Sequence, residues 1–357
     1  MTAQQRRRYA YLGPAATFTE AALIDLLTER RELLTAQRVP MRSAETMLEA
    51  VRAGEVDAAV VPIENSVEGG VPATLDALTR YGRLQIVAEA VVPVRFVLAA
   101  LPGTVTLETL RTYGTHPHAE AQTRLWMQRH APRAEYRPTS STAAAAQELA
   151  ASATGAQSEG VADGARTALP TGASDPVGAS ADAGAPSVPY QAVIGPMLAA
   201  QAYGLEVLAD DIGENTLAET RFICVERPGA IPEPTGWDRT TIVVGLASDR
   251  AGALLEMLEQ LSARGVNMSR IESRPTGDGL GLYQFSIDAL GHVAEARVAE
   301  ALRGIHRVAA TVKFLGSYPM ASAARTELNG TKKAVDPRVA DEAFERAQAW
   351  FDEVTGG

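Results

Sequence analysis

Asp57-Ala58-Ala59-Val60-Val61, which lies between Gly54 and Pro62, is the stretch that decides how the first part of this chain folds. A continuous run of small and β-branched apolar residues is typical of a strand buried on both faces, as in a parallel sheet. Residues 44–53 before it carry apolar side chains at helical spacing, and Gly54 ends that helix. Helix, strand and loop alternate in this way from Tyr9 to Val225, so the sequence predicts an α/β region with a largely parallel sheet.

The composition is that of an ordinary globular protein. The chain has 357 residues, enough for two or three domains, and its residues are 46% hydrophobic and 21% charged. It contains no run of about 18 apolar residues, so we predict no membrane span. The net charge of −10 argues against nucleic-acid binding, which normally needs a basic surface. Cys224 is the only cysteine, which excludes an intramolecular disulfide and favours a cytoplasmic location.

Two segments complete the α/β region, which we place at residues 8–226. The apolar run Val91–Ala100 predicts a central strand. Residues 151–189 consist mostly of Ala, Gly, Ser, Asp and Pro and include no aromatic residue. A segment of this composition buries too little apolar surface to offset its chain entropy, so we predict a disordered insertion. The α/β pattern resumes at 191–195, and the insertion therefore interrupts the domain rather than ending it.

The C-terminal part reads as a separate small domain. Proline and glycine mark a linker at residues 227–239. Residues 240–318 then follow the order β-α-β-β-α-β, which predicts a ferredoxin-like fold. In the tail at 319–357, Asp336 and Pro337 predict the start of an amphipathic helix, because proline is favoured in a first helical turn. The apolar stripe of that helix needs a surface to cover it.

Three polar segments are candidates for chemistry: residues 61–70, 113–122 and 215–225. The first leaves a buried strand, at the kind of position where ligands bind in α/β sheets, although it could equally be a capped turn. In the second, Thr115 can cap a helix whose free amides suit an anion. His116 and His118 in that segment would suit a metal, but a third ligand with supporting spacing is missing, so we predict no metal. The third segment is a polar pair at a strand entrance, which could be satisfied locally.

Together, these segments resemble prephenate dehydratase. The resemblance covers residues 9–318 except the insertion, and its order along the chain makes it specific. It rests on the following motifs: Tyr11-Leu12-Gly13-Pro14 with Thr17-Phe18-Thr19, Val61-Pro62-Ile63-Glu64-Asn65-Ser66, Thr115-His116-Pro117, Ser141-Thr142, Tyr203-Gly204-Leu205-Glu206-Val207-Leu208 and Thr220-Arg221-Phe222. The C-terminal domain resembles the ACT regulatory domain of the same enzymes.

The resemblance implies a catalytic region of two α/β lobes, similar to a periplasmic binding protein, with the active site in the cleft. Thr220 matches the essential threonine of the family, Asn65 an asparagine of the substrate pocket, and Gln122 a glutamine near it. Thr115 stands where serine is more common, so the hydroxyl is kept. Ser66, Thr115 and the amides near Thr17 are further candidates for binding the two substrate carboxylates. His118 stands where glutamine is usual, which leaves the role of its loop open.

The implied reaction is the loss of water and carbon dioxide from prephenate, which gives phenylpyruvate for phenylalanine biosynthesis. Aromatisation drives it, so we predict no cofactor. Our hypothesis is that Thr220 hydrogen-bonds the leaving hydroxyl, directly or through a water molecule. If Thr220 faces the substrate, alternation along the strand sends Arg221 to the opposite face. We therefore favour a structural salt bridge for Arg221 over a substrate contact.

The resemblance also implies that phenylalanine binds between two ACT domains, which requires at least a dimer, either a homodimer or a homotetramer. The residues that match the family's effector site are Gly252, Ala253, Leu254, Glu272, Ser273, Arg274 and Pro275. Ala251 stands where proline is usual, which barely affects this interpretation. Two alternatives stay open. An arogenate dehydratase would share nearly every motif, and a two-lobed fold could also be a non-catalytic amino-acid sensor.

Overall fold

The computed structural model describes residues 6–80, 84–158, 188–246, 250–276, 283–322 and 336–356, with the backbone alone for 154–158. The chain forms two compact units. The first unit comprises residues 1–13, 18–93 and 218–357, and the second comprises residues 14–17 and 94–217. The two lobes expected for the α/β region therefore lie in different units, and the C-terminal domain belongs to the first. None of the described helices is long and apolar enough to cross a membrane.

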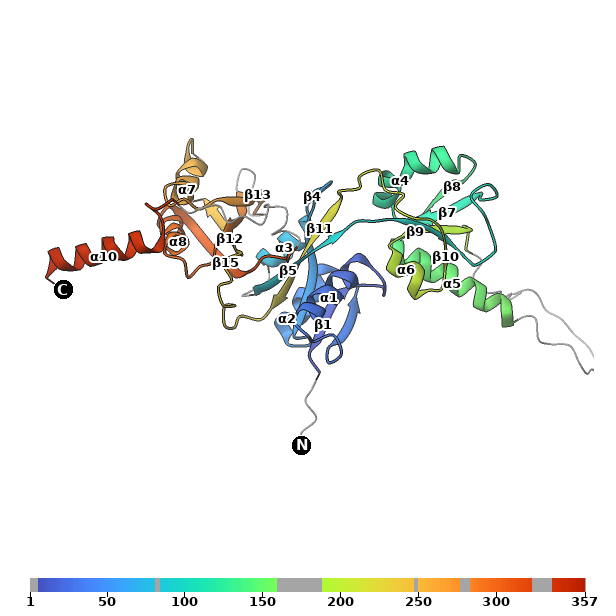
Figure 1. The fold of residues 1–357 in the computed structure, drawn as a ribbon, viewed down its shortest axis with the longest axis horizontal. Helices are drawn as coiled ribbons and strands as arrows, with labels where there is room; N and C mark the ends of the chain where they lie inside the picture. Colours follow the sequence, from blue (N-terminus) through green and yellow to red (C-terminus); the bar gives the residue numbers. More distant parts are fainter. Residues whose placement is uncertain are drawn as a thin grey trace, which may run out of the picture. The chain divides into compact units, whose positions relative to one another are not determined.

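The first lobe is built on one mixed sheet with the strand order β2-β1-β3-β11-β5. Figure 1 labels β1, β11, β5 and the short β4 of this sheet. Its strands are β1 (Arg8–Leu12), β2 (Gln37–Met41), β3 (Ala58–Asn65), β5 (Gln85–Pro93) and β11 (Glu219–Glu226), with the short β4 (Gly69–Gly70) beside β3. Its helices are α1 (Phe18–Glu29), α2 (Ala44–Ala53) and α3 (Pro72–Arg80). Strands β1, β2 and β3 are parallel, whereas β11 runs antiparallel to both β3 and β5.

The apolar run that ends at Val61 forms the buried centre of this sheet. Residues 58–61 of β3 have no exposed surface. The helix before them is α2. Ser43 caps its start, because the Ser43 hydroxyl accepts a hydrogen bond from the Thr46 amide. Gly54 ends it in a left-handed conformation, with φ of 79°. The predicted helix and buried strand are thus confirmed. The expectation of a largely parallel sheet is wrong, because β11 re-enters the lobe after the second unit and pairs with β3 in the opposite direction.

The second lobe has its own sheet with the order β10-β6-β9-β7-β8. Its elements are β6 (Val97–Ala100), β7 (Thr112–Thr115), β8 (Glu135–Pro138), β9 (Ala192–Gly195), β10 (Glu206–Ala209), α4 (Pro117–His130), α5 (Thr142–Ser158) and α6 (Met197–Ala202). The single central strand predicted at Val91–Ala100 is wrong. Strand β5 ends at Pro93 and β6 begins at Val97, so the apolar run is shared between the sheets of the two units.

The C-terminal domain has the predicted ferredoxin-like topology. Its sheet has the order β13-β14-β12-β15 and is antiparallel throughout. Its elements are β12 (Asp238–Leu246), α7 (Ala253–Ser262), β13 (Met268–Pro275), β14 (Tyr283–Leu290), α8 (Ala296–Val308) and β15 (Ala309–Pro319). Ile242 and Val244 of β12 pack with α7 and α8 in one core, whereas Val243 belongs to the core of the first lobe. Alternation along β12 therefore places the sheet between its own helices and that lobe.

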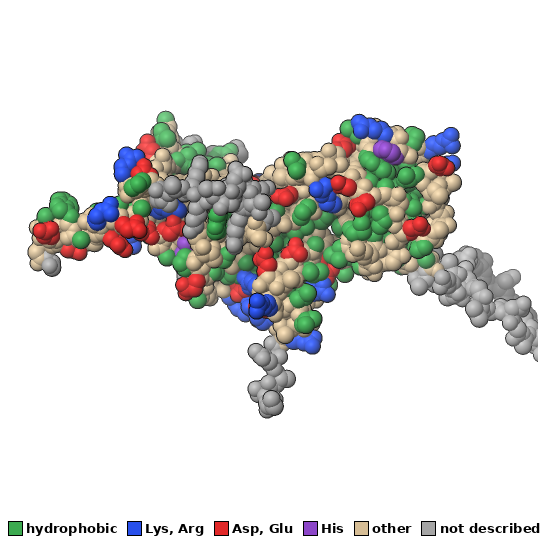
Figure 2. All heavy atoms as spheres, viewed as in Figure 1, with side chains coloured by type: hydrophobic (Ala, Val, Ile, Leu, Met, Phe, Trp, Pro, Cys, Tyr) green, Lys and Arg blue, Asp and Glu red, His purple; other side chains and the backbone are tan. Residues whose placement is uncertain are grey.

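Two segments differ from expectation in extent. The predicted insertion at 151–189 begins inside α5, which continues to Ser158 because alanine has the highest helix propensity; residues 159–187 lie outside the described residues. The tail helix α10 (Asp341–Thr355) begins five residues after Asp336. None of its residues is buried, and Trp350, the largest side chain of its apolar stripe, is 63% exposed. Figure 2 shows hydrophobic and acidic side chains together along it.

Candidate active site on strands β3 and β11

The ends of β3 and β11 bring together two of the predicted site residues. Thr220 is the register partner of Asn65 in the antiparallel pair. The Asn65 Nδ2 group donates a hydrogen bond of 2.8 Å to the Thr220 hydroxyl oxygen. Thr220 is 9% exposed. Residues that are 155 positions apart in the sequence thus form one polar pair at the end of a buried sheet.

The orientation of the Asn65 amide is fixed by its other end. Its Oδ1 atom accepts hydrogen bonds from the amides of Val67, at 2.8 Å, and Glu68, at 3.1 Å. An amide oxygen that binds two backbone N–H groups leaves only the NH₂ group to face Thr220. The Thr220 oxygen is therefore an acceptor in this pair, and its own proton is available for donation elsewhere. A hydroxyl that accepts a hydrogen bond becomes polarised and donates its proton more readily.

Ser66 holds the entrance of β11 in place. Its amide donates to the Glu219 carbonyl oxygen at 2.9 Å, and its hydroxyl accepts from the Glu219 amide, also at 2.9 Å. These two bonds fasten the residue before Thr220 to the residue after Asn65. They extend the pairing of the two strands beyond the last ladder residues and reduce the freedom of the Asn65–Thr220 pair.

The remaining predicted substrate residues lie in the second unit. Thr115 ends β7, is fully buried, and donates its hydroxyl proton to the Ile194 carbonyl oxygen at 2.7 Å. Gln122 is a half-buried residue of α4, and Thr17 directly precedes α1. The expected helix cap at Thr115 is wrong. Because Pro117 is the first residue of α4, the capping position falls on His116, whose ring nitrogen accepts from the His118 amide at 3.3 Å.

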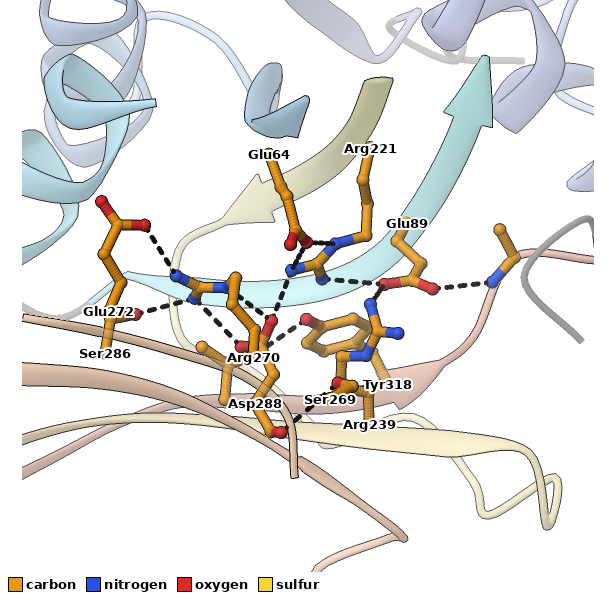
Figure 3. A network of polar contacts seen from close by, with 12 residues as sticks. Glu64, Glu89, Arg221, Arg239, Ser269, Arg270, Glu272, Ser286, Asp288 and Tyr318 are labelled. Carbon is orange, nitrogen blue, oxygen red and sulfur yellow. Dashed lines mark hydrogen bonds and ion pairs between the residues drawn. The ribbon is translucent and has the colours of Figure 1, made fainter. Parts of the chain in front are cut away.

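Arg221 lies on the other side of the strand in a buried ion network, as favoured from the sequence (Figure 3). Its Nε atom donates to Glu64 at 3.1 Å and its Nη1 atom to Glu89 at 3.2 Å. Its Nη2 atom donates to Asp288. Arg221 is 7% exposed, and the side chains of Glu89 and Asp288 are fully buried. The salt-bridge interpretation of Arg221 is therefore confirmed.

The network joins the first lobe to the C-terminal domain. Arg239 of β12 donates to Glu89 at 2.6 Å, and Arg270 of β13 donates its Nε proton to Asp288 of β14 at 2.9 Å. Burial alone would raise the pKa of Asp288, but Arg221 and Arg270 hold it far below its usual range. Burial, together with the Asp288 charge, raises the pKa of the Tyr318 hydroxyl beside them to about 12.

Glu89 and Asp288 are the two buried carboxylates of this network, and sequence reasoning missed both, as it missed Arg239, Arg270 and Tyr318. Each is a single carboxylate within an apolar strand, in Val87-Ala88-Glu89-Ala90-Val91 and in Phe285-Ser286-Ile287-Asp288-Ala289. A buried carboxylate requires a cationic partner. The pattern was therefore a usable signal for an ion pair, although nothing in the sequence says which arginine supplies it.

The residues that match the effector site lie in two segments of the C-terminal domain. Gly252 precedes α7 with a φ of 84°, a conformation that glycine adopts without strain, and Ala253 and Leu254 open that helix. Residues 272–275 end β13. There, Arg274 forms a bidentate contact with Asp76 of α3, at 3.1 and 2.8 Å. The described residues include no group of three or more His, Cys, Asp or Glu side chains placed to bind a metal.

Comparison with known proteins identifies the family. The family model described as prephenate dehydratase matches residues 9–230, more than half of the chain. The chain belongs to the prephenate dehydratase family. A second family model, the ACT domain, matches residues 240–307. The prephenate dehydratase model thus covers both α/β lobes, and the ACT model covers the ferredoxin-like domain from β12 to α8, with β15 beyond its end.

Individual relatives agree with this assignment. The prephenate dehydratase of Mycolicibacterium vanbaalenii is 41% identical over 319 residues, which cover 87% of this chain and 90% of that protein. The enzyme of Amycolatopsis methanolica is 39% identical and covers 98% of both chains. Among solved structures, the prephenate dehydratase of Arthrobacter aurescens in complex with L-Phe is 47% identical, with a TM-score of 0.79 over 98% of this chain and 100% of that one.

Proposed function

We propose that this chain converts prephenate to phenylpyruvate, carbon dioxide and water, with Thr220 as the catalytic residue. The bond from the ring to one carboxylate breaks, and its electron pair enters the ring as the ring hydroxyl departs. The departing hydroxide takes up one proton to become water. The Thr220 hydroxyl supplies that proton, directly or through a water molecule, and regains it from solvent. The enzyme is a carbon–oxygen lyase, in keeping with its family.

The orientation of the Asn65–Thr220 pair is the observation that carries this proposal. Because Asn65 donates to the Thr220 oxygen, the hydroxyl proton of Thr220 is directed away from the protein partner and remains available to the leaving group. A positioned donor of this kind typically contributes a factor of about 10²–10³ to turnover. We further propose that Ser66, Thr115, Gln122 and Thr17 contribute to binding the substrate, as the family resemblance implies.

The function is tested by the turnover of purified protein on prephenate, with arogenate as the competing substrate. We expect phenylpyruvate to form from prephenate at a rate far above that of a protein-free control, and arogenate to react poorly. Faster turnover of arogenate would contradict the proposed substrate preference. A correctly folded protein that acts on neither compound would contradict the proposed activity and favour an amino-acid sensor.

We also propose that the ACT domain binds phenylalanine as an effector. The support is the L-Phe complex of the Arthrobacter aurescens enzyme together with the match of Gly252–Leu254 and Glu272–Pro275 to the family's effector segments. Isothermal titration of the full chain with phenylalanine tests the proposal. We expect binding heat in the natural protein and its loss in Gly252→Val, because valine is strained at a φ of 84°. Undiminished heat in that variant would refute the placement.

Two remaining parts of the proposal concern the state of the protein. We propose a homodimer or homotetramer, because the resemblance places the effector between two ACT domains, and sedimentation equilibrium measures this directly. A monomer at micromolar concentration would contradict it. We also propose a cytoplasmic location, which fractionation of cells that produce the protein would test.

A further inference from the structure

Each residue of the catalytic pair is the chain neighbour of one member of an ion pair on the opposite face of the sheet. Glu64 directly precedes Asn65, and Arg221 directly follows Thr220. Because successive side chains of a strand point to opposite faces, Glu64 and Arg221 lie on the face away from the Asn65–Thr220 hydrogen bond. They are register partners in the same ladder and are joined by an ion pair of 3.1 Å.

The ladder alone does not fix this end of the two strands. The register between β3 and β11 shifts directly after Arg221, because Phe222 pairs with Pro62 and Ile63 has no register partner on β11. Such a bulge interrupts regular pairing and changes the local twist. The position of the last two residue pairs therefore depends on contacts beyond the regular ladder. Ser66 provides one of these on the side of Thr220, and the partners of Arg221 provide the others.

The ACT domain supplies one of the two fully buried carboxylate partners of Arg221. Asp288 of β14 is fully buried and accepts hydrogen bonds from Arg221, from Arg270 at 2.9 and 3.2 Å, and from the Thr241 hydroxyl at 2.8 Å. In Figure 3, Arg221 and Arg270 approach the Asp288 carboxylate from opposite sides. A buried guanidinium that loses a carboxylate partner keeps its desolvation penalty, so the loss of Asp288 would leave Arg221 with only Glu64 and Glu89 and would weaken its hold.

The same contacts lead from Asp288 to the proposed effector segment. Arg270 lies on β13, and its Nη1 atom is buried without a hydrogen bond, 3.5 Å from the nearest Glu272 carboxylate oxygen. Glu272 also reaches the first lobe, because a β-carbon added to Gly70 would overlap its carboxylate. Gly70 is the register partner of Glu64 on β4. A small movement of Glu272 would thus tighten its ion pair with Arg270 into a hydrogen bond or break it, beside the Gly70–Glu64 pair of β4 and β3.

We propose that Asp288 is a positioning residue for catalysis, and that it carries the effector signal from Glu272 through Arg270 and Arg221 to the Asn65–Thr220 pair. Asp288 does not touch the substrate. It holds Arg221, and Arg221 holds the end of β11 against β3 at the spacing that presents the Thr220 hydroxyl. An effector shifts activity only if its contacts differ between two arrangements, and the Arg270–Glu272 ion pair, which at 3.5 Å lacks a hydrogen bond, is the contact that would differ. The signalling step rests on the proposed phenylalanine site.

The test compares natural protein with Asp288→Asn, using Lys313→Met as a matched control. Lys313 of β15 also joins the ACT domain to the first lobe, through hydrogen bonds to the carbonyl oxygens of Leu78 and Thr79, but it does not contact Arg221. Each protein is assayed for kcat and KM on prephenate, for the change in rate on adding phenylalanine, and for the heat of phenylalanine binding. Unfolding midpoints show that each variant is folded.

For Asp288→Asn we expect kcat to fall about tenfold or more with little change in KM, because displaced catalytic groups lose rate more than affinity. We expect the ratio of the rates with and without phenylalanine to approach one, while the heat of phenylalanine binding persists. Lys313→Met should keep natural kcat and response. A folded Asp288→Asn variant with natural kcat and response would overturn the inference, as would equal losses in both variants.

If Asp288→Asn does not fold, Arg270→Lys tests the same route. Arg270→Lys retains the charge but removes one of the two contacts to Asp288, and we expect it to reduce the phenylalanine response. A full response in that variant would overturn the proposed route. Failure of the proposed function gives a different result, because the natural protein itself would then show neither turnover of prephenate nor heat with phenylalanine.

Discussion

Glu89 is the residue whose replacement tests the buried network most sharply. Its Oε2 atom accepts hydrogen bonds from Arg221, at 3.2 Å, and Arg239, at 2.6 Å, and its Oε1 atom accepts from the Ala321 amide at 3.0 Å. All three partners are donors. In Glu89→Gln the new NH₂ group must face at least one of them, so at least one buried donor loses its acceptor and the two arginines lose a compensating charge.

The structure sets the expected size of the effect. One unsatisfied buried donor costs about 1–3 kcal/mol, and breaking a buried ion pair on one side costs about 3–5 kcal/mol. Because whole proteins are stable by only about 5–15 kcal/mol, we expect Glu89→Gln to lower the thermal unfolding midpoint by several degrees. Circular dichroism during heating, at pH 7 and fixed protein concentration, measures this midpoint.

Glu226→Gln is the matched control. Glu226 also pairs with two arginines, Arg7 at 2.9 Å and Arg30 at 3.4 Å, but its side chain is 22% exposed. Ion pairs that water reaches contribute only about 0–1 kcal/mol, so this control should leave the midpoint almost unchanged. Equal midpoints for the two variants would refute the reasoning, because burial of Glu89 would then have no energetic consequence.

Three further predictions follow from single groups. The pKa of Asp288 lies far below its ordinary value of 3.8. Its ion pairs therefore stabilise the fold fully above about pH 4 and less as the pH falls further. The difference in unfolding midpoint between natural protein and Asp288→Asn should be constant from about pH 8 to about pH 5 and shrink below about pH 4. Constancy down to about pH 2 would contradict this. Burial raises the pKa of Cys224 to about 12, so a disulfide reagent at pH 8 should label it only after unfolding; rapid labelling of the native protein would be inconsistent with that burial. Gly316 has a φ of 149°, and a β-carbon there would overlap the Ile86 carbonyl oxygen, so Gly316→Ala should lower the midpoint by several degrees. Gly229→Ala should not, because a β-carbon at Gly229 would meet only the Arg227 carbonyl oxygen, at 4.0 Å.

Much of the fold was predictable because it follows from local patterns. The buried run at 58–61, the helix before it and the six elements of the ACT domain all show the spacing of apolar residues expected for their type. The direction of β11 was not predictable in this way. A strand that returns to a sheet after more than a hundred residues can run either way, and only the path through the second unit decides it.

The candidate site likewise has features that follow from local patterns and features that depend on distant contacts. Alternation along one strand was enough to separate Thr220 from Arg221, since neighbouring residues must face opposite sides. It did not reveal that Asn65 is the hydrogen-bond partner of Thr220, because that contact depends on the register of two strands that are distant in sequence. The partners of Arg221 in the ACT domain were hidden for a further reason. The sequence separates the two domains by a linker, yet Val243 and Tyr318 pack into the core of the first lobe.

The measurement that tests the central claim most directly is the kcat of Thr220→Val on prephenate. Valine has nearly the shape of threonine and removes only the hydroxyl, which is the proposed donor to the leaving group. We expect kcat to fall by about 10²–10³, with KM little changed, and Thr220→Ser to recover most of the loss because it restores the hydroxyl. A folded Thr220→Val protein with near-natural turnover would contradict the claim that the hydroxyl presented by Asn65 performs the chemistry.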